Sequence, residues 1–268
     1  MKRPGRKAYL LIALAALAMV ALPFLFWYQT WFGRKLNDAQ LDEYFADRDK
    51  PRHAQHALVQ LGERLSRHQN VSRWYPQVVA QASSPRVELR QTAAWVMGQD
   101  RTCRPFHDAL SRLIHDPAAM VRRNAALGLA AFGDAEARPE LLAMLRSFTL
   151  VAPVSGALRY RLKSGEYVNP GTLVAHVGNS EVRAPVPGEV RAFDASDGAA
   201  VASGQPLAEL AADQNHVWEA LRALYVVGER SDLEEVARYT HPLPGIPEIV
   251  QQQAIATEQA IQDRPTTP

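Results

Sequence analysis

The 268-residue sequence predicts a mainly α-helical solenoid with an inserted small all-β sandwich and one N-terminal transmembrane helix. Three observations support this fold class. Helical segments recur at an interval of 32 residues, a glycine-rich motif occurs twice in residues 151–210, and residues 8–28 are apolar. We expect these segments: 1–33, a basic tip and membrane anchor; 37–149, helical repeats; 150–211, the β-sandwich; 212–262, further helices; and 263–268, a disordered tail.

The apolar run contains no charged residue, and Pro23 is its one interruption. An α-helix needs about 20 apolar residues to cross a bilayer. Four basic residues precede the run and only Arg34 and Lys35 closely follow it, so the positive-inside rule places the N-terminus in the cytoplasm. Aromatic side chains suited to the headgroup region stand at the far end of the run: Trp27, Tyr28, Trp31 and Phe32.

A cleaved signal peptide is the competing interpretation of this run, with residues 16–18 (Ala-Leu-Ala) as a small-residue cleavage site. The apolar stretch continues through Phe26, which is longer than a usual signal core and favours an uncleaved anchor. Under either interpretation the rest of the chain is exported. We therefore expect a single-pass protein of the inner (cytoplasmic) membrane whose bulk is periplasmic or otherwise extracytoplasmic.

Residues 85–98 and 117–130 align without a gap, and each segment carries a proline, an arginine and paired alanines at matching positions. Residues 51–62 form a looser copy that ends at Gly62. A repeat of this length is typical of stacked-helix solenoids. We expect each proline in the first helical turn and a glycine, such as Gly133, just past the helix end. The partner and later helices are expected at residues 74–82, 105–114, 139–145, 217–228, 233–239 and 247–261.

These copies resemble HEAT repeats, in particular the HEAT-like repeats named after phycobilisome lyases, in their pattern of Pro, Val-Arg, Ala-Ala and Leu-Gly. The resemblance implies a solenoid that presents a binding surface to a protein partner. It implies no chemistry beyond the lyase-like activity in the name. Because helices resume after residue 210, we infer that the β-sandwich is inserted between repeats of one solenoid, which either stack across it or are capped by it.

The inserted segment contains two copies of one motif, each with an Ala-Pro pair followed by spaced glycines. Ala152 and Ala184 differ by 32 positions, and Gly165 and Gly198 differ by 33. Between the copies, Gly178-Asn179 fits a two-residue hairpin turn. The segment predicts two pseudo-symmetric sheets packed as a flattened sandwich.

This segment resembles the biotinyl/lipoyl-attachment fold and, more closely, the lipoyl-like modules of HlyD-type membrane fusion proteins. Carriers of that fold hold a modified lysine at the turn between the halves, whereas Gly178–Glu181 contains none and the nearest lysine is Lys163. Fusion-protein adaptors insert a long helical hairpin at the same turn, and this chain has no such insertion. We therefore expect no lipoyl or biotin cofactor.

Other sites are disfavoured by composition. Removing the four N-terminal basic residues leaves 26 Lys and Arg against 28 Asp and Glu, so the exported part has no basic surface suited to nucleic acid. His53 and His56 are three residues apart but have no evident further ligand, and Cys103 is the one cysteine. We expect no catalytic residue, no metal site and no small-molecule substrate.

The leading hypothesis is a non-enzymatic, membrane-tethered scaffold that binds a protein partner in the cell envelope. The alternative is an accessory component, similar to membrane fusion proteins, of an envelope transport or secretion system. Repeat arginines either form a basic ridge for an acidic partner or brace the turns between repeats, and the tryptophans are either core residues or a partner hot spot. The candidate partner-binding residues are Trp95, Arg90, Arg122, Arg123 and Trp218.

Overall fold

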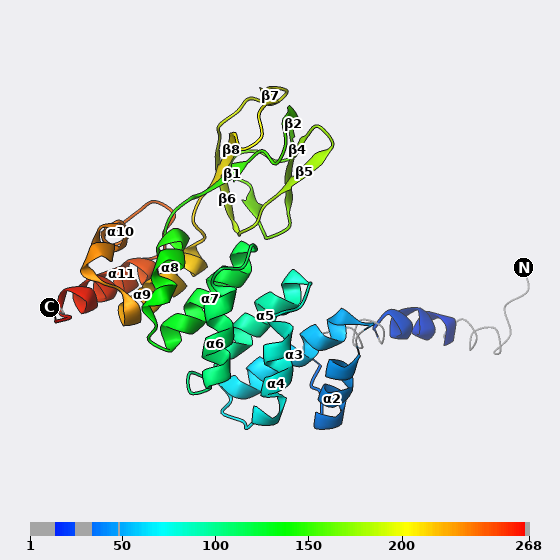
Figure 1. Cartoon of the computed structure of the whole chain (residues 1–268). Helices are drawn as coiled ribbons and strands as arrows, with labels where there is room; N and C mark the ends of the chain where they lie inside the picture. Colours follow the sequence, from blue (N-terminus) through cyan, green and yellow to red (C-terminus); the bar gives the residue numbers. More distant parts are fainter. Residues whose placement is uncertain (1–13, 25–33, 48, 266–268) are drawn as a thin grey trace, which may run out of the picture. The chain divides into compact units, whose positions relative to one another are not determined.

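A computed structural model describes residues 14–24, 34–47 and 49–265, and the chain divides into two compact units, residues 1–69 and 70–268 (Figure 1). Residues 14–24 are helical and mostly exposed. In the described ranges no helix has the length and apolar character needed to cross a membrane. The remainder of the expected membrane span, residues 8–13 and 25–28, lies outside the described residues.

The first unit contains α2 (Asp38–Ala46) and α3 (Pro51–Ser66). Asn37 begins α2 with a capping box, because its side chain accepts from Gln40 N–H while the Gln40 side chain accepts from Asn37 N–H. Pro51 lies in the first turn of α3, as predicted. Gly62 does not end this helix, and the prediction of a helix end there was wrong: the residue is buried inside α3, which continues for another turn.

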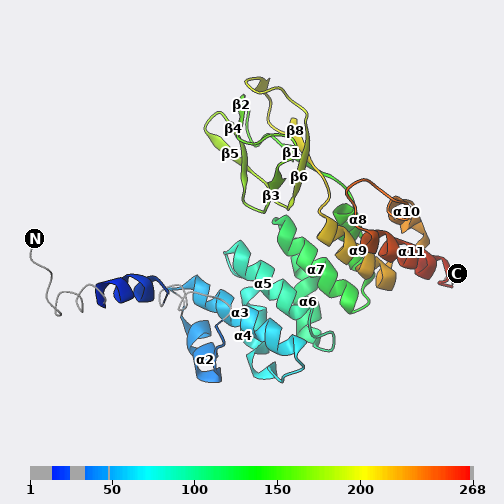
Figure 2. The ribbon, with the colours of Figure 1, turned by 180° about the vertical axis from the view of Figure 1, so that it is seen from behind.

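The helices of the second unit form two layers that pack on each other. In one layer α5, α7, α9 and α11 contact each other in succession, and the second layer pairs with them. Figures 1 and 2 show this succession. The helices are α4 (Tyr75–Gln81), α5 (Val87–Met97), α6 (Arg104–Leu113), α7 (Ala119–Ala131), α8 (Arg138–Met144), α9 (Gln214–Val227), α10 (Leu233–Ala237) and α11 (Glu248–Gln262). The helical segments expected from the sequence in this unit are confirmed.

The turns before α5 and α7 differ from the prediction. Pro85 and Pro117 precede the cap residues Arg86 and Ala118, which are extended, so these prolines lie before the first helical turn rather than in it. The turn is held instead by a side-chain acceptor at one matched position. Ser84 Oγ accepts from Arg86 N–H and Asp116 Oδ1 accepts from Ala118 N–H.

The end of α7 follows the prediction. Gly133 has φ of 78° just past the C-cap Phe132, a conformation that suits glycine. Its N–H donates to Ala130 O, and Asp134 N–H donates to Leu129 O. This pair of bonds is the Schellman arrangement, which satisfies carbonyls that the helix leaves open.

The inserted segment forms two four-stranded antiparallel sheets, with strand orders β1-β8-β6-β3 and β5-β4-β2-β7. Moving each strand four places along the chain converts one order into the other, so the doubled sequence motif produces two equivalent sheets. Val177 pairs with Ser180 across the expected Gly178-Asn179 turn. The strands are β1 (Phe148–Val151), β2 (Gly156–Tyr160), β3 (Tyr167–Val168), β4 (Leu173–Val177), β5 (Ser180–Arg183), β6 (Gly188–Phe193), β7 (Ala200–Val201) and β8 (Pro206–Leu210).

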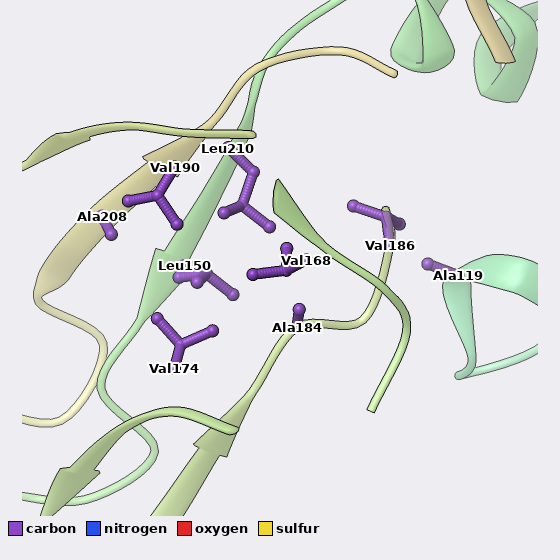
Figure 3. Close-up of a cluster of buried hydrophobic side chains, with 9 residues drawn as sticks. All are labelled: Ala119, Leu150, Val168, Val174, Ala184, Val186, Val190, Ala208 and Leu210. Carbon is purple, nitrogen blue, oxygen red and sulfur yellow. The ribbon is translucent and has the colours of Figure 1, made fainter. Parts of the chain in front are cut away.

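The solenoid stacks across this insertion, because the two ends of the sandwich lie side by side. Phe148 of β1 pairs with Leu210 of β8, so the chain leaves α8 and returns to α9 at one place. As a result, α9 packs on both α7 and α8. The sandwich also rests on the start of α7, where Ala119 joins a buried cluster with Val186 and Leu150 (Figure 3).

Candidate protein-binding groove

A groove crosses the layer formed by α5, α7 and α9 and contains a cavity of about 290 Å³. Helix spacing explains part of this lining: Asn124 and Gly128 are four residues apart on α7, so they share a helix face, while Trp95 lies on α5 and Gln99 just past its end. The lining residues are Trp95, Gly98, Gln99, Asn124, Leu127, Gly128, Ala130, Ala131, Glu219, Arg222, Ala223 and Val226.

Two glycines set the depth of the groove. A Cβ on Gly98 would lie 3.0 Å from the Gly128 Cα, and a Cβ on Gly128 would lie 2.8 Å from Leu110 Cδ1. The backbones of α5 and α7 therefore approach more closely than side chains would allow. Asn124 fixes the same pair of helices by donating from Nδ2 to Gln91 O at 3.0 Å.

The groove exposes large apolar side chains. Trp95 is 39% exposed although Ala94 and Val96 beside it are buried, so its ring projects from α5 instead of joining the core. Val226 on the opposite wall is 54% exposed, and Leu127 on the floor is half-buried. Exposed tryptophan is typical of binding hot spots, because a large rigid side chain gains contact area at little entropic cost.

Glu219 and Arg222 are the two charged residues that line the cavity. Arg222 places its guanidinium 4.7 Å from the centre of the Trp218 ring, which is a cation–π contact. Burial and the nearby Asp213 raise the pKa of Glu219, while the charge of Arg222 lowers it by less. Within the described ranges, Glu219 forms neither a hydrogen bond nor an ion pair.

A second hollow, of about 430 Å³, lies at the other end of the same α5 and α7 faces. One wall is the sandwich, through Phe148, Pro170 and the segment around Ala184, and the other is the start of the two helices. The sandwich therefore bounds the exposed face of the solenoid.

The candidate residues Arg90 and Arg122 occupy equivalent places in two repeats. Each donates from Nη1 to the carbonyl six residues earlier, at Ser84 and Asp116 respectively. Arg90 also binds Asp116 with two hydrogen bonds of 2.6 and 3.0 Å, and Arg122 Nε donates to Glu140 at 2.9 Å. Both side chains thus brace turns between helices, which is the second of the two roles expected for repeat arginines.

Arg123 is only 6% exposed, so it offers little surface to an external partner. Its Nη1 lies 2.8 Å from His216 Nδ1 on α9. Because arginine only donates, His216 must accept with an unprotonated Nδ1. Burial and the charge of Arg123 accordingly lower the pKa of His216, against the opposing charge of Asp213.

The tryptophans divide between core and groove. Trp74 is 2% exposed and belongs to the core, whereas Trp95 lines the groove and Trp218 is half-buried beneath Arg222. Sequence reasoning did not find Glu219, Asn124 or Gly128. Glu219 directly follows Trp218, but it becomes a groove residue only because α9 packs on α7 across the inserted sandwich.

The remaining sequence expectations concern metals and cofactors. In the part of the chain that the structure describes, no three His, Cys, Asp or Glu residues come together as a metal site. His53 contacts Asp47, and His107 contacts Asp134 at 2.8 Å. Cys103 is a half-buried free thiol beside the start of α6.

Comparison with known proteins bears on the helical segment. The family model for HEAT repeats matches residues 75–149. That range spans α4 to α8, so this segment is similar to HEAT repeats and that part of the resemblance is confirmed there, while the likeness to the repeats named after phycobilisome lyases stays a prediction. No curated protein matches the chain. The likeness of residues 150–211 to lipoyl-like modules stays a prediction.

Proposed function

We propose that the chain is a non-catalytic scaffold that binds a protein partner in the groove between α5, α7 and α9. The observation that carries this proposal is the exposed Trp95 in a groove of a HEAT-repeat layer. HEAT repeats are general protein-interaction modules. The helix surface on which Trp95 lies has an apolar floor and wall, as the centre of a protein interface requires.

The proposal includes a membrane tether and export of the soluble part. It is supported by the apolar run of residues 8–28, by the aromatic residues at its end and by the basic N-terminus. A tether confines the groove near the membrane, so it raises the effective concentration for a membrane-borne partner. Alkaline extraction of membranes tests whether the chain is tethered. Protease accessibility in spheroplasts tests on which side of the membrane the soluble part lies. Release by alkali, or protection of the soluble part, overturns this half of the proposal.

Photocrosslinking from defined positions tests the groove. A photoreactive amino acid replaces Gln99, which is exposed at the groove edge, or Arg112, which is exposed on α6 in the other layer. We expect one discrete crosslinked protein from position 99, much less from position 112, and loss of the product when Trp95→Ala is added. Equal crosslinking from both positions contradicts the groove. Products confined to probes in residues 151–210, and reaching a transporter, favour the transport-accessory alternative instead.

A further inference from the structure

We propose that the partner inserts a basic side chain, a lysine or arginine flanked by apolar residues, into the cavity lined by Trp95 and Glu219. This inference rests on the proposed function, since it names the chemistry that the groove recognises. The occupant is a segment of a protein partner. The positive charge of the inserted side chain is inferred from the charges that line the cavity.

Helix geometry directs Glu219 into the groove. Glu219, Ala223 and Val226 follow each other at intervals of four and three residues, so they form one face of α9. All three line the cavity, and Trp95 lines it from α5. A side chain entering between α5 and α9 therefore meets a carboxylate and an aromatic ring in the same space.

The positive charge in the groove, on Arg222, already takes part in a cation–π contact. Arg222 is exposed and its guanidinium lies over the Trp218 ring, while no ion pair joins it to Glu219 in the described part of the chain. Glu219, by contrast, is half-buried and forms no hydrogen bond or ion pair there, and the charge of Arg222 offsets the effect of its burial only in part. The charged side chain of the groove lining that forms no ion pair or cation–π contact in the described residues is therefore the carboxylate.

A cation relieves this situation. Desolvation disfavours the charged form of a carboxylate, in agreement with the raised pKa of Glu219, and a nearby positive charge restores it. An aromatic ring adds to the attraction, because a tryptophan face draws cations. A lysine or arginine stem also buries methylene groups against apolar walls such as Leu127 and Val226.

The size of the cavity favours a side chain over a free ligand. Pockets for small-molecule ligands usually range from about 300 to 1,000 Å³. The groove cavity, at about 290 Å³, falls just below that range and opens onto an exposed helix face. A single side chain from a longer segment fits it, with flanking residues lying along the helices.

The first step of the test is selection from a random peptide library displayed on phage, with the full-length chain immobilised in detergent micelles. We expect selected peptides to share a lysine or arginine with apolar neighbours. Their binding should be lost with Trp95→Ala, which places them in the groove. Selection against Glu219→Gln should lose the basic residue from the shared pattern.

The second step measures the coupling. A selected peptide and its version with norleucine in place of the basic residue are titrated by fluorescence anisotropy. We expect the basic peptide to bind at least about tenfold more weakly to Glu219→Gln, while the norleucine peptide binds both proteins alike. Glu189→Gln is the matched control, because Glu189 is an exposed carboxylate on β6 outside the groove. Thermal melts confirm that each variant is folded.

The outcomes separate this inference from the proposed function. Groove peptides with no basic preference, or with acidic residues that depend on Arg222, overturn the inference and leave the protein-binding groove intact. Peptides insensitive to Trp95→Ala, or no selection at all, overturn both. A dimer of the full chain that Trp95→Ala dissociates would show that a second copy fills the groove, which also overturns the inference.

Discussion

Two helix–helix contacts of the solenoid differ in how the chain connects the helices. We call the packing of α5 on α7 the first joint and the packing of α7 on α9 the second joint. The contacts that hold the first joint are short in sequence. Arg90 and Asp116 are separated by 26 positions, and Asn124 and Gln91 by 33 positions. The contact between Arg123 and His216 in the second joint spans 93 positions, because the sandwich intervenes. Both joints nevertheless pack consecutive helices of one layer.

An insertion of this length does not prevent stacking when it begins and ends at one place. Pairing of β1 with β8 returns the chain to its point of departure, so the second joint forms as if the insertion were short. The chemistry of the two joints differs, however. Glycines and a local ion pair make the first joint, while side chains from α7 and α8 reach across the insertion to make the second.

The largest effect is expected at Arg138, which helps to hold the helices on the two sides of the insertion together. Its guanidinium donates twice to Asp232, at 2.8 Å each, and Asp232 is 2% exposed. Arg138→Met leaves that carboxylate buried without its cation, so we expect the free energy of unfolding to fall by about 3 kcal/mol. Urea denaturation measures it. Arg112→Met, an exposed change on α6, is the control, and an equal effect of both would contradict this account.

A somewhat smaller loss is expected at the first joint from Gly98→Val. The new Cβ would lie 3.0 Å from the Gly128 Cα, which is backbone and cannot rotate away. The helices must separate, and overpacking of this kind costs about 2 kcal/mol. Gln99→Val, the adjacent exposed change, should alter unfolding by no more than about 0.5 kcal/mol. If the two substitutions destabilise the chain equally, the close approach of α5 and α7 is not needed.

The first joint was largely predictable from the sequence and the second was not. The 32-residue interval locates α5 and α7, and Gly133 marks a helix end because a positive φ there suits glycine. The same interval aligns Arg90 with Arg122. Their equivalent hydrogen bonds, to the carbonyls of Ser84 and Asp116, follow from this alignment. What the interval could not show is that these bonds engage the arginines inside the solenoid.

The groove could be predicted only in part, because one of its walls comes from beyond the insertion. Trp95 was a candidate on its helix alone. Glu219 gained its place from α9 packing on α7, a contact that depends on three-dimensional closure of the sandwich. Arg123 is buried for the same reason, since His216 of α9 covers it. Helical periodicity within one segment carries no information about such neighbours.

A moderate effect is expected where the sandwich contacts the second joint. Tyr167 of β3 donates to Asp213 Oδ2 at 2.8 Å, and burial together with this bond raises the pKa of Tyr167 to about 12. Tyr167→Phe removes the bond, so we expect about 1 kcal/mol of destabilisation. Hydrogen exchange should be faster in β3 and at the start of α9 but unchanged in α5. Tyr225→Phe, at an exposed position on α9, is the control. Unchanged exchange at α9 would show that the sandwich does not support this joint.

The smallest expected effect is a difference between the two joints in how their stability depends on pH. The pKa of His216 is lowered from 6.5, so below that pH the unfolded chain takes up a proton that the folded chain resists. Stability from this group is complete above about pH 6.5 and is lost as pH falls towards the lower folded pKa. Burial opposes ionisation of Asp116 in the first joint, but Arg90 and the Ala118 N–H outweigh it and lower its pKa from 3.8. That stability is lost only as pH falls below about 4.

Hydrogen exchange measured between pH 7 and 5 separates these contributions. After correction for the intrinsic exchange rate, protection of α9 should fall while protection of α5 stays constant. His216→Asn, which keeps an acceptor for Arg123, should remove the fall in protection at α9, and His241→Asn at an exposed position should preserve that fall. An equal fall in both helices would mean that acid weakens the solenoid as a whole. In that case the joint across the insertion has no separate sensitivity, and the distinction between the two joints rests on their connectivity alone.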